Sequence, residues 1–277
     1  KEMEEYNCAY QHWLKSTEEV KQKDPQASWK EIHKICGECP WPQPVGWQSP
    51  FRPNGLHETM IRRIAPYSLR GFLYYQGEED VQRYADYSDM MQMLVKQWRM
   101  DWNDWNLPFL FVQLPMYLAD GEKDDSYWAL QREQQYIASM MIQNAGMISL
   151  ADCGEYDNIH PLDKKTPGER LFQLAKNLVY DKQGTITATA AQLFSDNGKL
   201  YVTFDHLHEK LVMQTANGCP FEISGEDNLF YPAKADVIHG NMLCISNPAV
   251  KFPSAVKYAW YNFGEAALFT ESGNPVS

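Results

Sequence analysis

Hydrophobic positions follow a helical period in the first part of the chain. Residues 2–22 place aromatic and aliphatic side chains three and four positions apart between charged ones, which is the pattern of an amphipathic helix. Ser28 and Glu31 then form the sequence pattern of a capping box, and this pattern predicts a second, short helix. Residues 40–53 hold five prolines and two tryptophans and are expected to form a loop. Residues 55–64 again have a helical pattern.

From Leu69 onward, short apolar runs alternate with long helical ones. The strand-like segments are 69–75, 109–113 and 147–151, and the helical segments between and after them are 81–100, 127–144 and 167–180. Strands separated by connections of this length form a parallel sheet with right-handed crossovers. This part of the chain is therefore predicted to be an α/β domain.

After about Asp181 the long helical segments stop, and short β-rich runs follow between turns. The runs are 185–190, 200–204, 210–214, 221–223, 233–239, 242–246 and 255–260. Repeated short strands of this kind predict an antiparallel β-sandwich. We therefore expect two domains, 1–181 with a helical and loop insertion over 1–53, and 182–277.

Composition and charge exclude several classes of function. The chain has 44% hydrophobic and 22% charged residues, and 25 Lys and Arg against 36 Asp and Glu give a net charge of −11. An acidic chain without a basic patch is a poor binder of nucleic acid. The longest apolar stretch, 107–119, is interrupted by prolines and is shorter than the roughly 20 residues of a membrane helix. We expect neither a nucleic-acid partner nor a membrane span.

Source and compartment are less constrained by the sequence. No signal peptide is visible after Lys1, and the chain lacks an N-x-S/T glycosylation acceptor, which favours a bacterial protein over an animal secretory glycoprotein. A secreted or periplasmic location and the bacterial cytoplasm both stay open. Cys36 and Cys39 form a C-x-x-C pair without a second ligand pair, so free thiols are favoured over a zinc site. We expect no metal and no cofactor.

The candidate chemistry lies just after the predicted strands, because parallel sheets bind ligands at the carboxyl ends of their strands. Gln76 and Gly77 follow the first strand, and a glycine there lets a substrate approach the backbone. Asp157 and His160 follow the third strand, three positions apart. A carboxylate at this spacing can orient an imidazole as a general base. The spacing alone is equally compatible with a structural Asp–His contact or a solvated loop.

Several segments resemble conserved blocks of one enzyme family. Residues 71–78 (GFLYYQGE) resemble a G-V-x-W-Y-Q-G-E block, and residues 107–114 (LPFLFVQL) resemble an L-P-F-x-x-V-Q-L strand. Residues 157–161 (DNIHP), followed by Lys165, Gly168 and Arg170, resemble a D-I-H-P…K…G-x-R-L block. The family is that of the sialate O-acetylesterases, carbohydrate esterases within the SGNH hydrolases. Residues 55–61 and 256–260 have counterparts there as well.

The resemblance implies a flavodoxin-like three-layer α/β fold and an enzyme that needs no cofactor and removes O-acetyl groups from sialic acid or related carbohydrates. It implies that His160 is the general base, that Asp157 orients it, and that Gln76 lends its side-chain amide to the oxyanion hole. Glu78 either contacts the substrate or only satisfies loop amides.

Three further residues are candidates for substrate binding. Gly77 lies beside the Gln76 amide. Tyr117 and Trp128 lie on the loop and helix start after the second predicted strand, where they can line a sugar pocket.

The chain departs from the family in one important respect. The G-Q-S-N turn that carries the family's nucleophilic serine and the G-G-T turn that carries an oxyanion glycine are both missing. Ser49 follows Gly-Trp-Gln, but a proline-rich loop precedes it rather than an apolar strand, so we do not expect it to be the nucleophile. We expect that serine on an upstream segment of the same protein, with the sheet incomplete without it. The alternatives are a non-catalytic carbohydrate-binding remnant and an acetyl xylan esterase.

Overall fold

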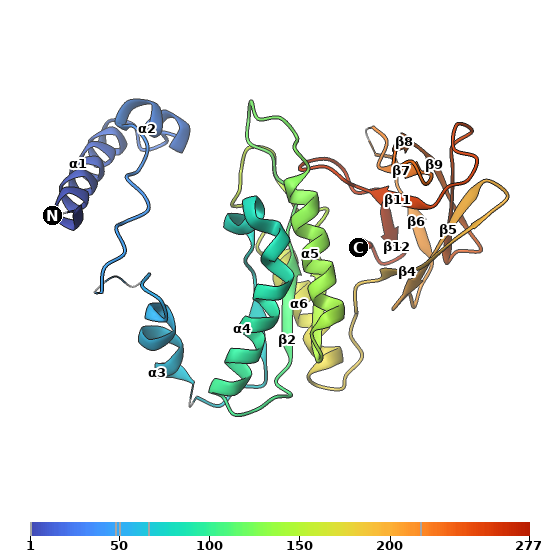
Figure 1. Ribbon diagram of the computed structural model, residues 1–277, viewed down its shortest axis with the longest axis horizontal. Helices are drawn as coiled ribbons and strands as arrows, with labels where there is room; N and C mark the ends of the chain where they lie inside the picture. The colour runs from blue at the N-terminus through green and yellow to red at the C-terminus, as the bar shows by residue number, and fades with distance from the viewer. Residues whose placement is uncertain (1, 48, 50, 66, 217) are drawn as a thin grey trace. The chain divides into compact units, whose positions relative to one another are not determined.

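The computed structural model describes residues 2–47, 49, 51–65, 67–216 and 218–277. The chain divides into two compact units, Lys1–Tyr67 and Ser68–Ser277. Figure 1 traces both by colour along the chain. The predicted domain boundary at 181/182 falls inside the second unit and stays a prediction.

The first unit is mainly helical. It contains α1 (Glu2–Lys23), α2 (Trp29–Cys36), the π-helical turn η1 (His57–Ile61) and α3 (Arg62–Ile64). The predicted capping box is confirmed, because the Ser28 hydroxyl accepts from the Glu31 backbone N–H and the Glu31 carboxylate accepts from the Ser28 N–H. The Trp13 indole N–H donates to the Gly37 carbonyl at 2.9 Å, which joins α1 to the end of α2.

The second unit begins with a parallel sheet, as predicted. Its strands are β1 (Phe72–Tyr74), β2 (Phe109–Gln113) and β3 (Ala145–Ser149), in the order β1-β2-β3. Phe72 lies opposite Phe109, and Phe109 lies opposite Ala145. Every residue of β2 is buried, whereas Leu73 at the centre of β1 is 64% exposed. The sequence of β2, apolar in its first four residues, is that of a strand covered on both faces.

Helices cover both faces of this sheet and make three layers (Figure 1). On one face, α4 (Tyr87–Asp101) and α5 (Tyr127–Met141) pack on the side chains of Phe109 and Phe111. On the other face, α6 (Lys165–Leu178) packs on Leu110 and Val112. The alternation of side chains along β2 therefore divides the core into two halves. A 3-10 helix, η2 (Glu78–Asp86), leads from β1 into α4.

The remainder of the second unit is rich in antiparallel strands. They are β4 (Thr189–Asp196), β5 (Lys199–Asp205), β6 (Leu211–Met213), β7 (Phe221–Ser224), β8 (Tyr231–Pro232), β9 (Lys234–Ile238), β10 (Met242–Ser246), β11 (Ala255–Tyr258) and β12 (Leu268–Thr270). They form sheets in the orders β4-β5-β10-β9, β11-β7-β8 and β12-β6. One buried cluster, including Val202, Ile223, Ile245 and Leu268, unites the three sheets. A β-sandwich stays a prediction for this region.

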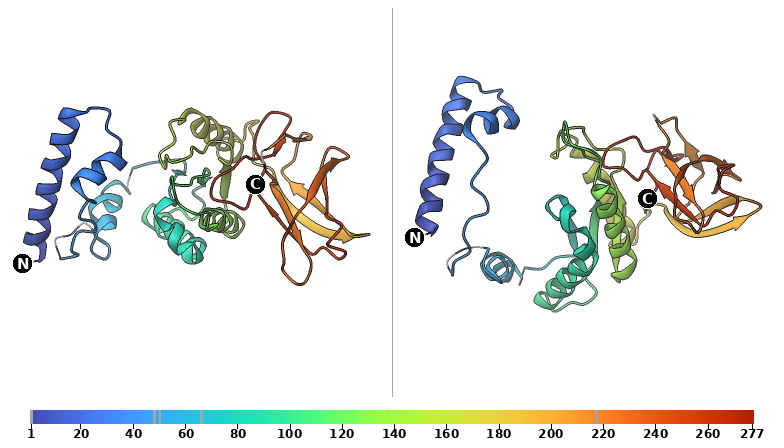
Figure 2. Two further views of the ribbon diagram at one scale, coloured as in Figure 1. Left: turned by 90° about the horizontal axis from the view of Figure 1, so that it is seen from above. Right: turned by 45° about the horizontal axis from the view of Figure 1, so that its top comes forward.

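The β-rich region contacts the α/β layers directly. The Tyr136 hydroxyl donates to the Ala190 carbonyl at 2.8 Å, and the Ser277 hydroxyl donates to Gln113 Oε1 at 3.0 Å. Figure 2 shows a red segment that follows β11 and runs back from the β-rich strands toward α5. Within the described part of the chain, none of the helices combines the length and the apolar character that crossing a bilayer requires.

Candidate active site

The carboxyl ends of the strands and the loop after β3 meet in one small apolar cluster. Its buried members are Val81, Leu114 and Trp128, and its partly buried members are Tyr75, Tyr117, Tyr127 and Ile159. These residues come from the segments that follow β1, β2 and β3. The structure thus brings together the three segments in which the sequence placed its candidate residues.

Gln76 is fixed at the end of β1 by hydrogen bonds to its backbone and its side chain. Its carbonyl accepts from the Tyr87 hydroxyl at 2.9 Å and from Gln135 Nε2 at 3.3 Å. Its Nε2 donates to Asp80 Oδ2 at 2.6 Å, and its Oε1 accepts from the Tyr74 hydroxyl at 2.9 Å. Because an amide nitrogen carries two hydrogens, the second hydrogen stays available for a substrate oxygen.

Gly77 occupies a position where any other residue would be strained. Its φ is 146°, and a Cβ there would lie 3.0 Å from both Gln131 Nε2 and Gln135 Nε2. The Gln131 amide is fully buried and has no hydrogen-bond partner within the described part of the chain. The close approach of this backbone to α5 therefore depends on glycine.

Glu155 organises the loop after β3. Its carboxylate accepts from Asn158 Nδ2 at 2.6 Å and from the Leu162 N–H at 2.6 Å. The Asn158 side chain in turn accepts from the His160 N–H at 3.1 Å. Together with the packing of Ile159 in the apolar cluster, these bonds give the loop one defined course while the His160 side chain stays exposed.

Asp157 is held by the loop that follows β2. Its N–H donates to the Leu118 carbonyl at 3.0 Å, and its Oδ1 accepts from the Asp120 N–H at 2.8 Å. Its φ of 57° places it in the left-handed region. Among the described residues, no hydrogen bond joins the Asp157 carboxylate to the His160 imidazole. The predicted pairing of the two side chains stays a prediction.

The other candidate residues surround this loop. Trp128 is 7% exposed and lies edge-on to the Tyr117 ring, with 5.2 Å between ring centroids. Burial raises the pKa of Tyr117, which is only partly exposed. Glu78 begins η2. Burial first, and the Glu78 charge second, raise the pKa of Tyr75 to about 12. Whether Tyr117, Trp128 or Glu78 contacts a sugar stays a prediction.

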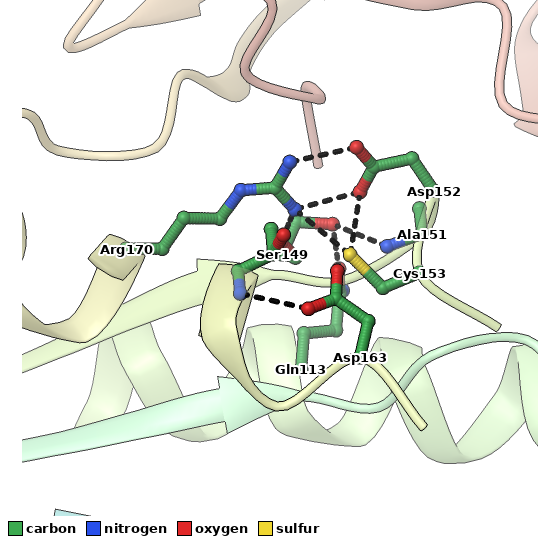
Figure 3. Close-up of polar contacts among 8 residues, drawn as sticks. Gln113, Ser149, Ala151, Asp152, Cys153, Asp163 and Arg170 are labelled. Atoms are coloured by element: carbon green, nitrogen blue, oxygen red, sulfur yellow. Dashed lines mark hydrogen bonds and ion pairs between the residues drawn. The ribbon is translucent and has the colours of Figure 1, made fainter. Parts of the chain in front are cut away.

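Arg170 forms an ion pair whose position the sequence did not predict. Figure 3 shows its guanidinium facing the Asp152 carboxylate, with both contacts at 2.6 Å. The same guanidinium donates to the Ser149 carbonyl at 2.9 Å. This bidentate pair fastens α6 to the end of β3, where the candidate loop begins. The only signal for it in the sequence was the arginine of the D-I-H-P…K…G-x-R-L resemblance.

We expect Cys153 to resist alkylation although it is only partly buried. Burial and then the Asp152 charge raise the pKa of its thiol to about 12, so almost no thiolate is present at pH 8. Removing that charge in Asp152→Asn lowers the pKa, so the thiolate fraction at pH 8 rises and iodoacetamide reacts faster. Peptide mass spectrometry over time measures both rates, and the exposed Cys8 is the internal control. Equal Cys153 rates in the two proteins would contradict the prediction.

Ser49 lies in the first unit and is locally satisfied. It is 3% exposed, and its hydroxyl oxygen accepts from Gln43 Nε2 at 3.0 Å and from the Phe51 N–H at 3.1 Å. These bonds agree with a structural role in the loop. No serine hydroxyl is hydrogen-bonded to His160 in the part of the chain that the structure describes.

Comparisons with known proteins agree on one group of relatives. Residues 44–177 match the family model described as carbohydrate esterase, sialic acid-specific acetylesterase. The sialate O-acetylesterase of Mus musculus is 27% identical over 236 residues, covering 76% of this chain and 43% of the mouse protein. That of Homo sapiens is 25% identical over 208 residues, covering 68% of this chain and 39% of the human protein.

A solved structure gives the same result. The crystal structure of a carbohydrate acetylesterase from Xanthomonas citri matches with a TM-score of 0.75 and 31% identity. The match covers 82% of this chain and 53% of that protein. The chain thus spans about half the length of the relatives it matches.

Proposed function

We propose that this chain, whose residues 44–177 belong to the sialic acid-specific acetylesterase family of carbohydrate esterases, hydrolyses O-acetyl esters of carbohydrates by a serine mechanism. One observation carries the proposal. The segments after β1, β2 and β3, which hold Gln76, Tyr117 and the Asp157–His160 loop, pack together at one end of the sheet. Ligands bind at this end in open α/β folds. The proposal includes the finer SGNH-type fold and a β-sandwich for the C-terminal strands.

Each residue has a defined part in the proposed reaction. His160 takes the proton of the serine hydroxyl as that oxygen attacks the acetyl carbonyl, and then gives it to the departing sugar oxygen. Asp157 orients the imidazole through Oδ2, because its Oδ1 is held by the Asp120 N–H. Water, deprotonated by His160, then attacks the acyl-serine, and His160 returns the proton to the departing serine oxygen as acetate is released. The free hydrogen of Gln76 Nε2 donates to the oxyanion, an interaction of about 3–4 kcal/mol in esterases and proteases.

The nucleophilic serine is proposed to lie on a segment upstream of Lys1. Two observations support this. Among the described strands β1 has β2 as its only neighbour, and the chain spans 53% of the Xanthomonas citri protein. A further strand beside β1 would cover its exposed side and end next to Gln76 and the candidate loop. An O-acetylated carbohydrate and this upstream segment are therefore the two proposed partners.

Release of acetate tests the proposal. The full-length protein is incubated with O-acetylated sialic acid, with O-acetylated xylan oligosaccharides and with p-nitrophenyl acetate. Turnover of either carbohydrate supports the esterase, and the ratio of the two kcat/KM values distinguishes a sialate esterase from an acetyl xylan esterase. Glycan binding without release of acetate from any substrate would support the non-catalytic alternative instead.

Chelation is expected to leave the rate unchanged. In the proposed mechanism His160 and Asp157 activate a serine, so no step needs a Lewis acid. The full-length protein is assayed with p-nitrophenyl acetate before and after dialysis against EDTA. A loss of activity in EDTA that added zinc restores would contradict a serine mechanism.

A further inference from the structure

Asn262, in the segment after β11, binds the loop between β2 and α5 with all of its polar groups. Its N–H donates to Asp124 Oδ2 at 2.8 Å, and its carbonyl accepts from the Tyr117 N–H at 2.8 Å. Its Oδ1 accepts from the Trp128 N–H at 3.0 Å, and its Nδ2 donates to Asp125 Oδ1 at 2.9 Å. Asn262 is 4% exposed. One residue of the β-rich region thus forms hydrogen bonds near both ends of the loop between β2 and α5.

The segment that carries Asn262 is itself anchored on α5. Arg132 is buried, and its guanidinium donates to the carbonyls of Ala259 at 2.9 Å and Tyr261 at 2.8 Å. Burial lowers the pKa of Arg132 to about 10, so the side chain is charged at neutral pH. Figures 1 and 2 show this red segment reaching the N-terminal end of α5. Its position is therefore fixed independently of the loop that it binds.

The bound loop carries four carboxylates in six positions. Residues 120–125 read DGEKDD. Like charges at this density repel one another and favour an open, solvated loop. Two of the four carboxylates, those of Asp124 and Asp125, accept hydrogen bonds from Asn262. Asn262 therefore donates hydrogen bonds to two of these carboxylates, and the bonds oppose the repulsion between the charges of the loop.

The same loop holds Asp157 in place. The Leu118 carbonyl and the Asp120 N–H bind the Asp157 N–H and carboxylate, at 3.0 and 2.8 Å. The neighbouring Tyr156 hydroxyl donates to Asp120 Oδ1 at 3.2 Å. The Tyr156 ring also packs on Phe263, with 5.6 Å between centroids. A continuous series of contacts thus leads from residues 262 and 263 to Asp157.

From this geometry we propose that Asn262 is a positioning residue for the active site. The β-rich region, through Asn262, sets the place of the β2–α5 loop, and the loop sets the direction of the Asp157 carboxylate. The inference rests on the proposed function in one respect, the role of Asp157 in orienting His160. Because Asp157 and His160 are exposed and lie on a loop, small displacements of their support change the direction of the imidazole. A misplacement of about 1 Å lowers rates about 100-fold.

The test compares two asparagine substitutions in the full-length protein. Asn262→Ala removes the bonds to Asp125 and Trp128. Asn247→Ala is the matched control, since the Asn247 side chain also forms two hydrogen bonds, to the Pro232 carbonyl and from the Ala249 N–H, but both lie within the β-rich region. Amide hydrogen exchange of residues 117–128 and 152–162 reports the loops, and kcat and KM for p-nitrophenyl acetate report the site. Phe263→Leu, which keeps every bond of Asn262, is the milder second variant if Asn262→Ala does not fold.

We expect Asn262→Ala to accelerate exchange in both segments and to lower kcat about 10- to 100-fold with little change in KM, because the small ester makes no sugar contacts. Asn247→Ala is expected to change neither. Unchanged exchange in residues 152–162 would overturn the inference whatever the activity. Faster exchange with an unchanged kcat would also overturn it, provided that Asp157→Ala lowers kcat. If Asp157→Ala itself leaves kcat unchanged, the proposed function fails, and the exchange data still show whether Asn262 holds the loop.

Discussion

His160→Ala is expected to lower kcat for acetyl ester hydrolysis by about 10⁶-fold, the size of the loss found when the histidine of a serine triad is removed. The proposed reaction needs the imidazole in both of its halves, to accept the serine proton and later to deprotonate water. Histidine is the side chain that most often serves as a general base near neutral pH, and His160 is the one histidine among residues 152–162. The binding step does not need the imidazole, so KM is expected to change little.

The same substitution is expected to leave the melting temperature nearly unchanged. The His160 side chain is exposed, and the hydrogen bond from its N–H to Asn158 is retained by alanine. Surface substitutions of this kind change stability by less than about 0.5 kcal/mol. Calorimetry together with kcat therefore separates a chemical role from a structural one.

Two further variants complete the experiment. Asp157→Asn keeps the size of the side chain but weakens its hold on an imidazolium, and we expect a smaller loss than for His160→Ala. His208→Ala removes an exposed histidine of the β-rich region and is expected to have no effect. A His160→Ala protein that turns over p-nitrophenyl acetate at the parental rate would remove His160 from the mechanism.

Residues 1–277 produced alone are expected to aggregate, whereas the full-length protein stays soluble. Leu73 at the centre of β1 is 64% exposed, and Met90 on the neighbouring α4 is 61% exposed. Met90 also lines a hollow of about 470 Å³, together with residues that include Tyr74, Tyr87 and Leu94. Exposed apolar strand edges pair with other chains. Covering one such leucine contributes about 1.5–3 kcal/mol, a large part of a typical total stability of about 5–15 kcal/mol.

The soluble fraction and the elution volume on gel filtration measure this effect, with the upstream segment supplied in cis, in trans or not at all. Leu73→Lys places a charge on the edge of β1 and is expected to make isolated residues 1–277 more soluble. Leu193→Lys, on the exposed strand β4, is the control and is expected to do much less. An isolated chain that is monomeric, unfolds cooperatively and hydrolyses an acetyl ester would show that its own sequence holds the nucleophile.

The sequence alone predicted the helices and strands that are determined by residues close together in the chain. The 3.6-residue period predicted α1 and α5, and short apolar runs predicted β2 and β10, within a few positions, because burial imposes both patterns directly. The capping box of α2 was predicted because its two partners are three residues apart. The blocks that resemble the sialate O-acetylesterases could be recognised because they are contiguous segments. Strands β8 and β12, of two and three residues, were missed.

The tertiary structure decided everything that depends on distant partners. Asn262 and Trp128 are 134 residues apart, and Asp157 and Asp120 are 37 apart, so no spacing in the sequence connects them. The sequence placed Trp128 at the start of a helix after the second strand, and only the packing of three loops around it leaves it 7% exposed. A local pattern records which side of an element is buried. The packing of the layers decides which distant residues come into contact. It also decides which polar groups form hydrogen bonds, because buried donors and acceptors must be paired.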